Sequence, residues 1–227
     1  GPDRFDQDGE GTGHREAALQ DQADWDRDVG QWLDAVERLS GTTEVLLVVT
    51  GASGVRPGPR EGLSAVASML AQVSAQAPLL MRLAGGVVGQ RRSELVQTVD
   101  LLPSLLEWLD VPGPLSALHG RSLLGLARGE RVAWRDAVVL GEAAVARAIR
   151  TAEFHLVVPA GQDDDPDARS LLFAKPDDLW DQMDLARQAP EVVERLAKRL
   201  AATVAWIEGG GEGEPPSLFP GWLAGRA

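Results

Sequence analysis

Two hydrophobic patterns alternate along the first half of the chain. Residues 25–39 carry apolar side chains at helical spacing and are followed by Gly41, so a helix is predicted here. Residues 44–50 (EVLLVVT) are a continuous, β-branched apolar run, which predicts a strand buried on both faces. The helical spacing returns over 63–73 and the strand pattern over 77–83 (APLLMRL). This order is typical of an α/β domain.

The pattern changes after residue 135. Before it, short helical segments are predicted over 101–109 and 121–127, the second closed by a glycine. After it, short strand-like runs separated by turns predict a small antiparallel sheet, and they lie at 137–140, 145–151, 154–159 and 170–174. Pro190 and the helical spacing of apolar residues as far as Ile207 then predict a long closing helix.

These elements predict an α/β fold: part of a three-layer α/β/α domain, then a small α+β C-terminal subdomain with an antiparallel sheet and a closing helix. The predicted boundaries are a flexible, polar lead-in over 1–23, the α/β domain over 24–134, the small subdomain over 135–208 and a Gly/Pro-rich tail over 209–227. Several tryptophans fall on apolar stripes and are expected to pack in the core or between helices, namely Trp25, Trp32, Trp108, Trp180 and Trp206.

Charge and composition narrow the possible functions. The formal net charge is −12, from 34 acidic and 22 basic residues, so a phosphate backbone would be repelled and nucleic acid is not an expected partner. No run approaches the ~18 to 20 uninterrupted apolar residues of a membrane helix. The absence of cysteine removes disulfides, thiolate metal sites and a Cys nucleophile. The sequence does not decide between a cytoplasmic protein and an exported one whose signal peptide has been removed.

The polar residues of the chain give few catalytic candidates. The histidines are His14, His119 and His155; they lack metal-ligand spacing, and His155 is expected on a sheet surface. Residues 163–167 (DDDPD) lack the Gly and the closing Glu of a calcium loop and are interpreted as a solvated loop. Residues 175–178 (KPDD) are interpreted as a structural turn.

Several segments carry a family resemblance. Residues 99–112 read VDLLPSLLEWLDVP, residues 44–54 read EVLLVVTGASG, and residues 77–86 read APLLMRLAGG. Further segments, in the same order along the chain, are 25–39, 118–129, 148–157 and 170–184. Together they resemble the C-terminal half of sulfatases, planctomycete-type members included, in the alkaline-phosphatase superfamily. The resemblance covers residues 24–208 and implies a sulfatase-like fold.

The resemblance also implies what chemistry to look for. Active sulfatases attack with a formylglycine made in a Cys/Ser-x-Pro/Ala-x-Arg motif, and acidic residues hold a divalent cation, usually calcium. That motif does not occur in this sequence. When the strand and loop are aligned on Thr50 and Gly54, Ala52 stands at the position of the ligand Asp and Ser53 at that of His or Asn. A methyl group cannot coordinate calcium and a neutral hydroxyl replaces a carboxylate poorly. The resemblance thus implies a degenerate metal site, no catalytic residue and no bound cofactor.

Two functions of different classes follow. The first is a catalytically inactive sulfatase-like domain with a binding or structural role, and the alternative is the C-terminal fragment of a sulfuric-ester hydrolase whose catalytic half lies elsewhere. A third possibility is a small α/β protein with fortuitous matches, and a structure without an antiparallel sheet after residue 135 would support it.

Residues 43–84 supply only a few strands of the family's large sheet, so an exposed edge is expected. A homodimer, a partner protein or a rearranged fold would cover it.

Overall fold

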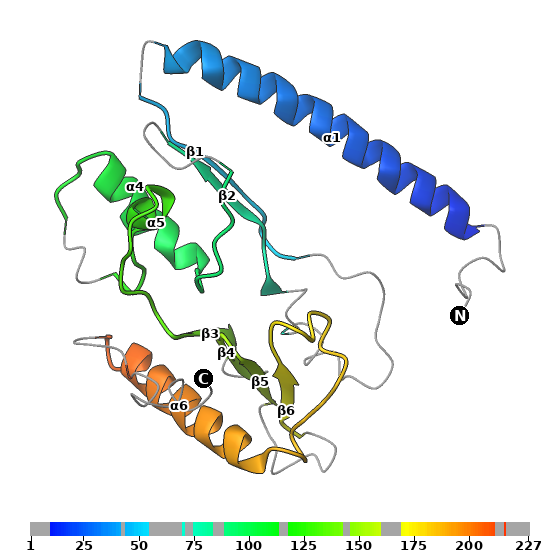
Figure 1. Ribbon diagram of the computed structural model, residues 1–227, viewed down its shortest axis with the longest axis vertical. Coiled ribbons are helices and arrows are strands. Elements are labelled where there is room, and N and C mark those ends of the chain that lie inside the picture. Colours follow the sequence, from blue (N-terminus) through cyan, green and yellow to red (C-terminus); the bar gives the residue numbers. More distant parts are fainter. Residues whose placement is uncertain are drawn as a thin grey trace. The chain divides into compact units, whose positions relative to one another are not determined.

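A computed structural model describes residues 10–41, 44–54, 70, 75–83, 89–113, 118–142, 146–159, 169–211 and 216 of the 227-residue chain. The chain divides into two compact units, Gly1–Leu47 and Val48–Ala227. Figure 1 shows the helices and strands of both units. None of the helices in the described ranges combines the length and the hydropathy needed to cross a membrane.

The first unit consists largely of one helix, α1 (Glu10–Ser40). It begins well before residue 25, so the expected flexible lead-in over 1–23 is wrong for residues 10–23. Among these residues are three Ala, two Gln and two Glu, which favour helix without forming an apolar stripe. Polar pairs support the helix, since the Asp24 carboxylate accepts from Gln20 at 3.2 Å and from Arg27 at 2.7 Å.

The helix's own unit does not bury the tryptophans of its apolar stripe, since Trp25 and Trp32 are 58% and 65% exposed. That these rings pack against another element stays a prediction. Helical spacing identified the stripe correctly, but spacing says only which residues share a face and nothing about whether another element covers that face.

Strands β1 (Leu47–Thr50) and β2 (Leu79–Arg82) form a two-stranded sheet. Both lie inside the predicted runs but are shorter. Burial on both faces was predicted for residues 44–50 and is wrong, because β1 is only partly buried and ends on the exposed Thr50. In β2 burial alternates, and Leu80 is 62% exposed. Alternation is what a strand shows when only one face of its sheet is covered. The helix predicted over 63–73 lies outside the described residues except for Leu70.

Three short helical elements precede the larger sheet. A 3₁₀ turn, η2 (Thr98–Asp100), leads directly into α4 (Leu101–Trp108), and α5 (Leu124–Ala127) follows. Pro103 is accommodated in the first turn of α4, where its missing N–H has no helical partner to lose. Gly129, with φ of 80°, follows α5 in the left-handed conformation. The prediction for 101–109 is confirmed, and the prediction for 121–127 is confirmed for 124–127.

The second half forms the predicted antiparallel sheet. Its strands are β3 (Ala137–Glu142), β4 (Ala146–Thr151), β5 (Phe154–Pro159) and β6 (Leu171–Ala174), in the spatial order β3-β4-β5-β6. Every neighbouring pair is antiparallel. The sheet after residue 135 removes the observation that would have supported fortuitous family matches. The closing helix α6 (Pro190–Glu208) also agrees with its predicted range.

The two faces of this sheet differ in chemistry. One face packs against α6 and forms the main core from Ile149, Leu156, Leu172, Leu196, Leu200 and Val204. The opposite face carries a smaller apolar cluster that includes Val157 and Phe173. On that second face His155 is fully buried, so its expected place on a sheet surface is wrong. Trp180 follows the sheet and is 52% exposed, which also contradicts its predicted packing. Most of the predicted tail over 209–227 lies outside the described residues.

Candidate functional site

The turn after β1 holds the positions where the family resemblance places metal ligands. Ala52 and Ser53 lie in a bend and both are exposed. The Gly51 N–H donates to the Pro78 carbonyl oxygen at 3.3 Å, which ties the turn to the start of β2. Within the described ranges, no three His, Cys, Asp or Glu side chains are grouped to hold a metal ion. The turn thus presents a methyl and a hydroxyl group to solvent.

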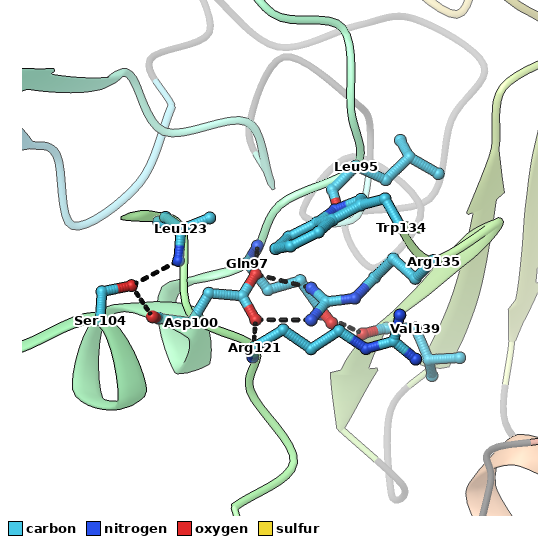
Figure 2. Close-up of polar contacts among 9 residues, drawn as sticks. All are labelled: Leu95, Gln97, Asp100, Ser104, Arg121, Leu123, Trp134, Arg135 and Val139. Atoms are coloured by element: carbon cyan, nitrogen blue, oxygen red, sulfur yellow. Dashed lines mark hydrogen bonds and ion pairs between the residues drawn. The ribbon is translucent and has the colours of Figure 1, made fainter. Parts of the chain in front are cut away.

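A buried carboxylate that the sequence analysis did not single out lies in η2. Asp100 is fully buried, and Figure 2 shows its side chain facing the guanidinium of Arg135. The Arg135 nitrogens Nη1 and Nη2 donate to Oδ2 at 2.6 Å and Oδ1 at 2.5 Å, a bidentate pair. The backbone N–H groups of Gln97 and Arg121 donate to the same oxygens at 2.7 and 2.8 Å. With two donors on each oxygen, Asp100 is a structural anchor.

The same anchor is joined to its surroundings by neutral hydrogen bonds (Figure 2). The buried Ser104 hydroxyl donates to the Asp100 carbonyl oxygen at 2.6 Å and accepts from the Leu123 N–H at 2.8 Å. The Gln97 side-chain amide donates to the Val139 carbonyl oxygen at 2.9 Å, and the Trp134 indole donates to that of Leu95 at 2.8 Å. The bond from Gln97 attaches the segment before η2 to strand β3.

A second buried polar cluster lies on the β4, β5 and β6 side of the subdomain. The Lys175 ammonium lies 2.6 Å from Oδ1 of Asp181, and both side chains are fully buried. The ammonium also donates to the Asp178 carbonyl oxygen. His155 Nδ1 lies 3.6 Å from the same Asp181 oxygen, beyond hydrogen-bond distance. The turn predicted at 175–178 thus also supplies Lys175, one partner of the buried ion pair with Asp181.

Arg150 completes this cluster from strand β4. Burial of its guanidinium lowers the pKa of Arg150, while the Asp181 carboxylate acts in the opposite direction. Desolvation is the larger effect. A carboxylate that already binds Lys175 therefore does not fully compensate the charge of Arg150.

A cavity of about 440 Å³ opens beside this cluster in the second unit. Its lining includes Arg150 and His155 from the sheet, and Thr50 from the end of β1. Ala52 and Ser53 do not line it. The structure thus brings the end of the strand before the degenerate ligand positions to the cavity and leaves the two positions themselves outside its lining.

The remaining candidates do not meet at one site. His14 belongs to α1, and His119 lies against the Trp206 ring with centroids 5.4 Å apart. The Asp-rich segment 163–167 lies outside the described residues. The sequence analysis missed Arg150 and Asp181, since strand pairing places Arg150 opposite His155 and Asp181 approaches them from the segment after β6.

Comparison with known proteins identifies the fold of this chain through solved structures. No protein-family model matches the chain, and no curated protein matches it. Among solved structures, a phosphonate monoester hydrolase from Silicibacter pomeroyi matches with a TM-score of 0.61 and 18% identity, over 81% of this chain and 38% of that chain. A protein solved with its substrate D-glucosamine-2-N,6-O-disulfate matches with a TM-score of 0.61 and 16% identity, over 84% of this chain and 39% of that one. A putative sulfatase from Bacteroides fragilis matches with a TM-score of 0.57 and 17% identity, over 82% of this chain and 40% of that chain.

These matches define the class of fold. The chain has the mixed α/β, sulfatase-like fold of these structures, which include a putative sulfatase and a phosphonate monoester hydrolase, and this agrees with the fold that the sequence resemblance implied. It spans about two fifths of the length of these structures.

Proposed function

We propose that this chain is a sulfatase-like domain that has no catalytic activity of its own and serves as a binding or structural module. The observation that supports this most directly is the turn after β1, where Ala52 and Ser53 occupy the aligned ligand positions and are exposed. The fold is retained while the residue types at the reacting centre are not those the chemistry needs.

The physical argument concerns the cation. Calcium takes six to eight oxygen ligands, and carboxylates supply the negative charge that makes its dehydration favourable. A methyl group at position 52 supplies no oxygen, and the hydroxyl of Ser53 carries no charge. Without a bound cation, the developing charge on a sulfuryl or phosphoryl oxygen lacks its main stabilising partner.

The test is an assay of the purified chain with 4-nitrocatechol sulfate and p-nitrophenyl phosphate, each with and without calcium. An active sulfatase assayed in parallel is the positive control. We expect turnover no faster than in buffer under every condition. Turnover that depends on calcium and is abolished by a chelator would contradict the proposal.

The alternative is that the chain is the C-terminal fragment of a sulfuric-ester hydrolase. The share of the matched structures that the chain spans favours this alternative. The sequence of the parent gene upstream of residue 1 discriminates between the two. A Cys/Ser-x-Pro/Ala-x-Arg motif preceded by adjacent aspartates supports the hydrolase, and an upstream sequence without them supports the inactive domain.

We also propose that a second copy or a partner protein covers an edge of the β1–β2 sheet. Two strands alone form a marginal sheet, and unpaired strand edges are sites of association. Light scattering of the purified chain is expected to show a dimer. A well-folded, strictly monomeric species at high concentration would contradict dimerisation.

A further inference from the structure

The cavity of about 440 Å³ lies apart from positions 52 and 53, where the family resemblance places metal ligands. Its walls come from residues 75–79, from residues 92–98 and from β3 side chains on the sheet face opposite α6. Much of the wall is apolar, including Leu79, Leu95, Val138 and Leu140. The rest of the lining is polar or charged and includes Gln76, Arg92, Glu94 and Gln97. A volume of this size that combines apolar walls with polar groups is suited to a small molecule that has both kinds of surface.

Two cationic or ionisable side chains lie together in this lining. Arg150 of β4 and His155 of β5 are directly opposite one another in the antiparallel register, so their side chains share one face of the sheet. His155 is fully buried, and neither ring nitrogen has a hydrogen-bond partner among the described residues. The buried Nη1 of Arg150 likewise has none within that part of the chain.

Unpaired donors of this kind are costly. Burying a polar group without a partner costs roughly 1–3 kcal/mol, and charged groups cost more. A neutral imidazole always carries one N–H, so His155 has at least one buried donor without an acceptor. An acceptor in the cavity, between Arg150 and His155, would satisfy both side chains at once.

The charges around the cavity show how many negative charges that acceptor needs. Arg92 and Glu94 form a pair at 3.8 Å, and Lys175 and Asp181 form one at 2.6 Å. Each pair is neutral, so among the charged side chains that the structure describes here the guanidinium of Arg150 is left as one positive charge in excess. A ligand with a single negative charge balances it, whereas a dianion would bring an unbalanced charge into a partly apolar cavity.

We propose that this cavity binds a small organic carboxylate, held by the Arg150 guanidinium and a ring nitrogen of His155, with its apolar part against the leucine and valine side chains. The planar fork of a guanidinium matches the two oxygens of a carboxylate. This inference does not depend on whether the chain is catalytically active, because Ala52 and Ser53 lie outside the cavity.

The experiment is an NMR titration of the full chain with benzoate, which follows the imidazole resonances of the three histidines. We expect benzoate in the millimolar range to shift the His155 resonances in a saturable way and to leave those of His119 unchanged. Benzamide, its neutral analogue, is expected to bind at least about tenfold more weakly, since a charge-assisted bidentate pair is lost. Phenyl phosphate is expected to bind no more tightly than benzoate.

Matched variants locate the site. Arg150→Met should weaken benzoate binding at least about tenfold, because the excess charge is removed. Arg147→Met is the control, since Arg147 lies on the same strand, is paired with Glu208 at 2.8 Å and does not line the cavity. It should leave the affinity unchanged. Because the cost of burying the Arg150 guanidinium outweighs its attraction to Asp181, its replacement by an apolar side chain should not lower the free energy of unfolding in the absence of ligand.

Several results would overturn the inference. The first is that the His155 resonances do not shift in the millimolar range of benzoate. The second is that benzamide binds as tightly as benzoate. The third is that Arg150→Met binds benzoate as tightly as the wild type. Tighter binding of phenyl phosphate would contradict the assignment to carboxylates. If Arg150→Met fails to fold, the His155 shifts and the benzamide comparison in the wild-type chain still decide the question.

Discussion

Asp100→Asn is predicted to destabilise the second unit strongly, although it replaces one side chain by another of nearly the same size. Each carboxylate oxygen of Asp100 accepts from one Arg135 nitrogen and from one backbone N–H, that of Arg121 at Oδ1 and that of Gln97 at Oδ2. An amide has one oxygen and one NH₂ group. In either orientation, the NH₂ group of asparagine would therefore meet one guanidinium donor and one backbone donor.

The magnitude follows from burial. The Asp100 side chain is fully buried and that of Arg135 is 11% exposed, so water cannot replace the missing acceptor for either group. Removing one partner of a buried ion pair costs roughly 3–5 kcal/mol. Since a whole domain is stable by about 5–15 kcal/mol, this is a large share of the total.

The assay is urea denaturation followed by tryptophan fluorescence, with the free energy of unfolding taken from the midpoint and slope. Trp134 reports near the site, because the guanidinium of Arg135 lies 5.2 Å from the centroid of its ring system. Glu107→Gln is the control. Its partner is Arg128 at 3.6 Å, and the two side chains are 41% and 44% exposed. The control should lose less than about 1 kcal/mol.

A double-mutant cycle with Arg135→Met separates the pair from its surroundings. We expect a coupling energy of at least roughly 1–2 kcal/mol between positions 100 and 135, because the residues are in direct contact. A loss for Asp100→Asn no larger than that for Glu107→Gln, or a coupling energy near zero, would refute the structural role assigned to Asp100.

Further predictions concern single contacts. Ser104→Ala should cost about 1–3 kcal/mol in urea denaturation, because the buried N–H of Leu123 loses its acceptor. Gly141→Ala should cost about 1–3 kcal/mol or more, because φ is +110° and the new Cβ would collide with the Ala146 carbonyl oxygen, whereas Gly113→Ala, with no atom within 4 Å, should have little effect. The hydrogen bond from Lys198 lowers the pKa of Glu194 below its ordinary 4.5, so its small stabilisation of α6 is present above that pH and is lost as the pH falls through the lowered pKa. Glu194→Gln should remove this part of the pH dependence in a circular-dichroism titration.

The sequence predicted most elements of the second unit. Apolar spacing identified α4 and α6, and alternating runs between turns identified the four strands from β3 to β6. These elements bury their apolar faces against one another, so the pattern and the packing agree. The start of α1 was not predicted, because residues 10–23 favour helix through propensity and polar pairs and not through an apolar stripe.

The buried polar residues could not be predicted from local pattern. The side chain of Asp100 gains its partners from residues 21 and 35 positions away, and no short-range signal marks such distant contacts. His155 and Arg150 meet through strand pairing, and Asp181 approaches them from beyond β6. The family resemblance, in contrast, placed Ala52 and Ser53 by alignment alone, and the structure adds that both are exposed.

The account depends most on the turn from Gly51 to Gly54. The most direct measurement is anomalous diffraction from crystals of the chain soaked in calcium, with data collected to reveal the cation. The account predicts no calcium peak in this turn, because Ala52 and Ser53 offer no carboxylate there. A calcium ion seated in the turn, with carboxylates from elsewhere in the chain converging on it, would contradict the account.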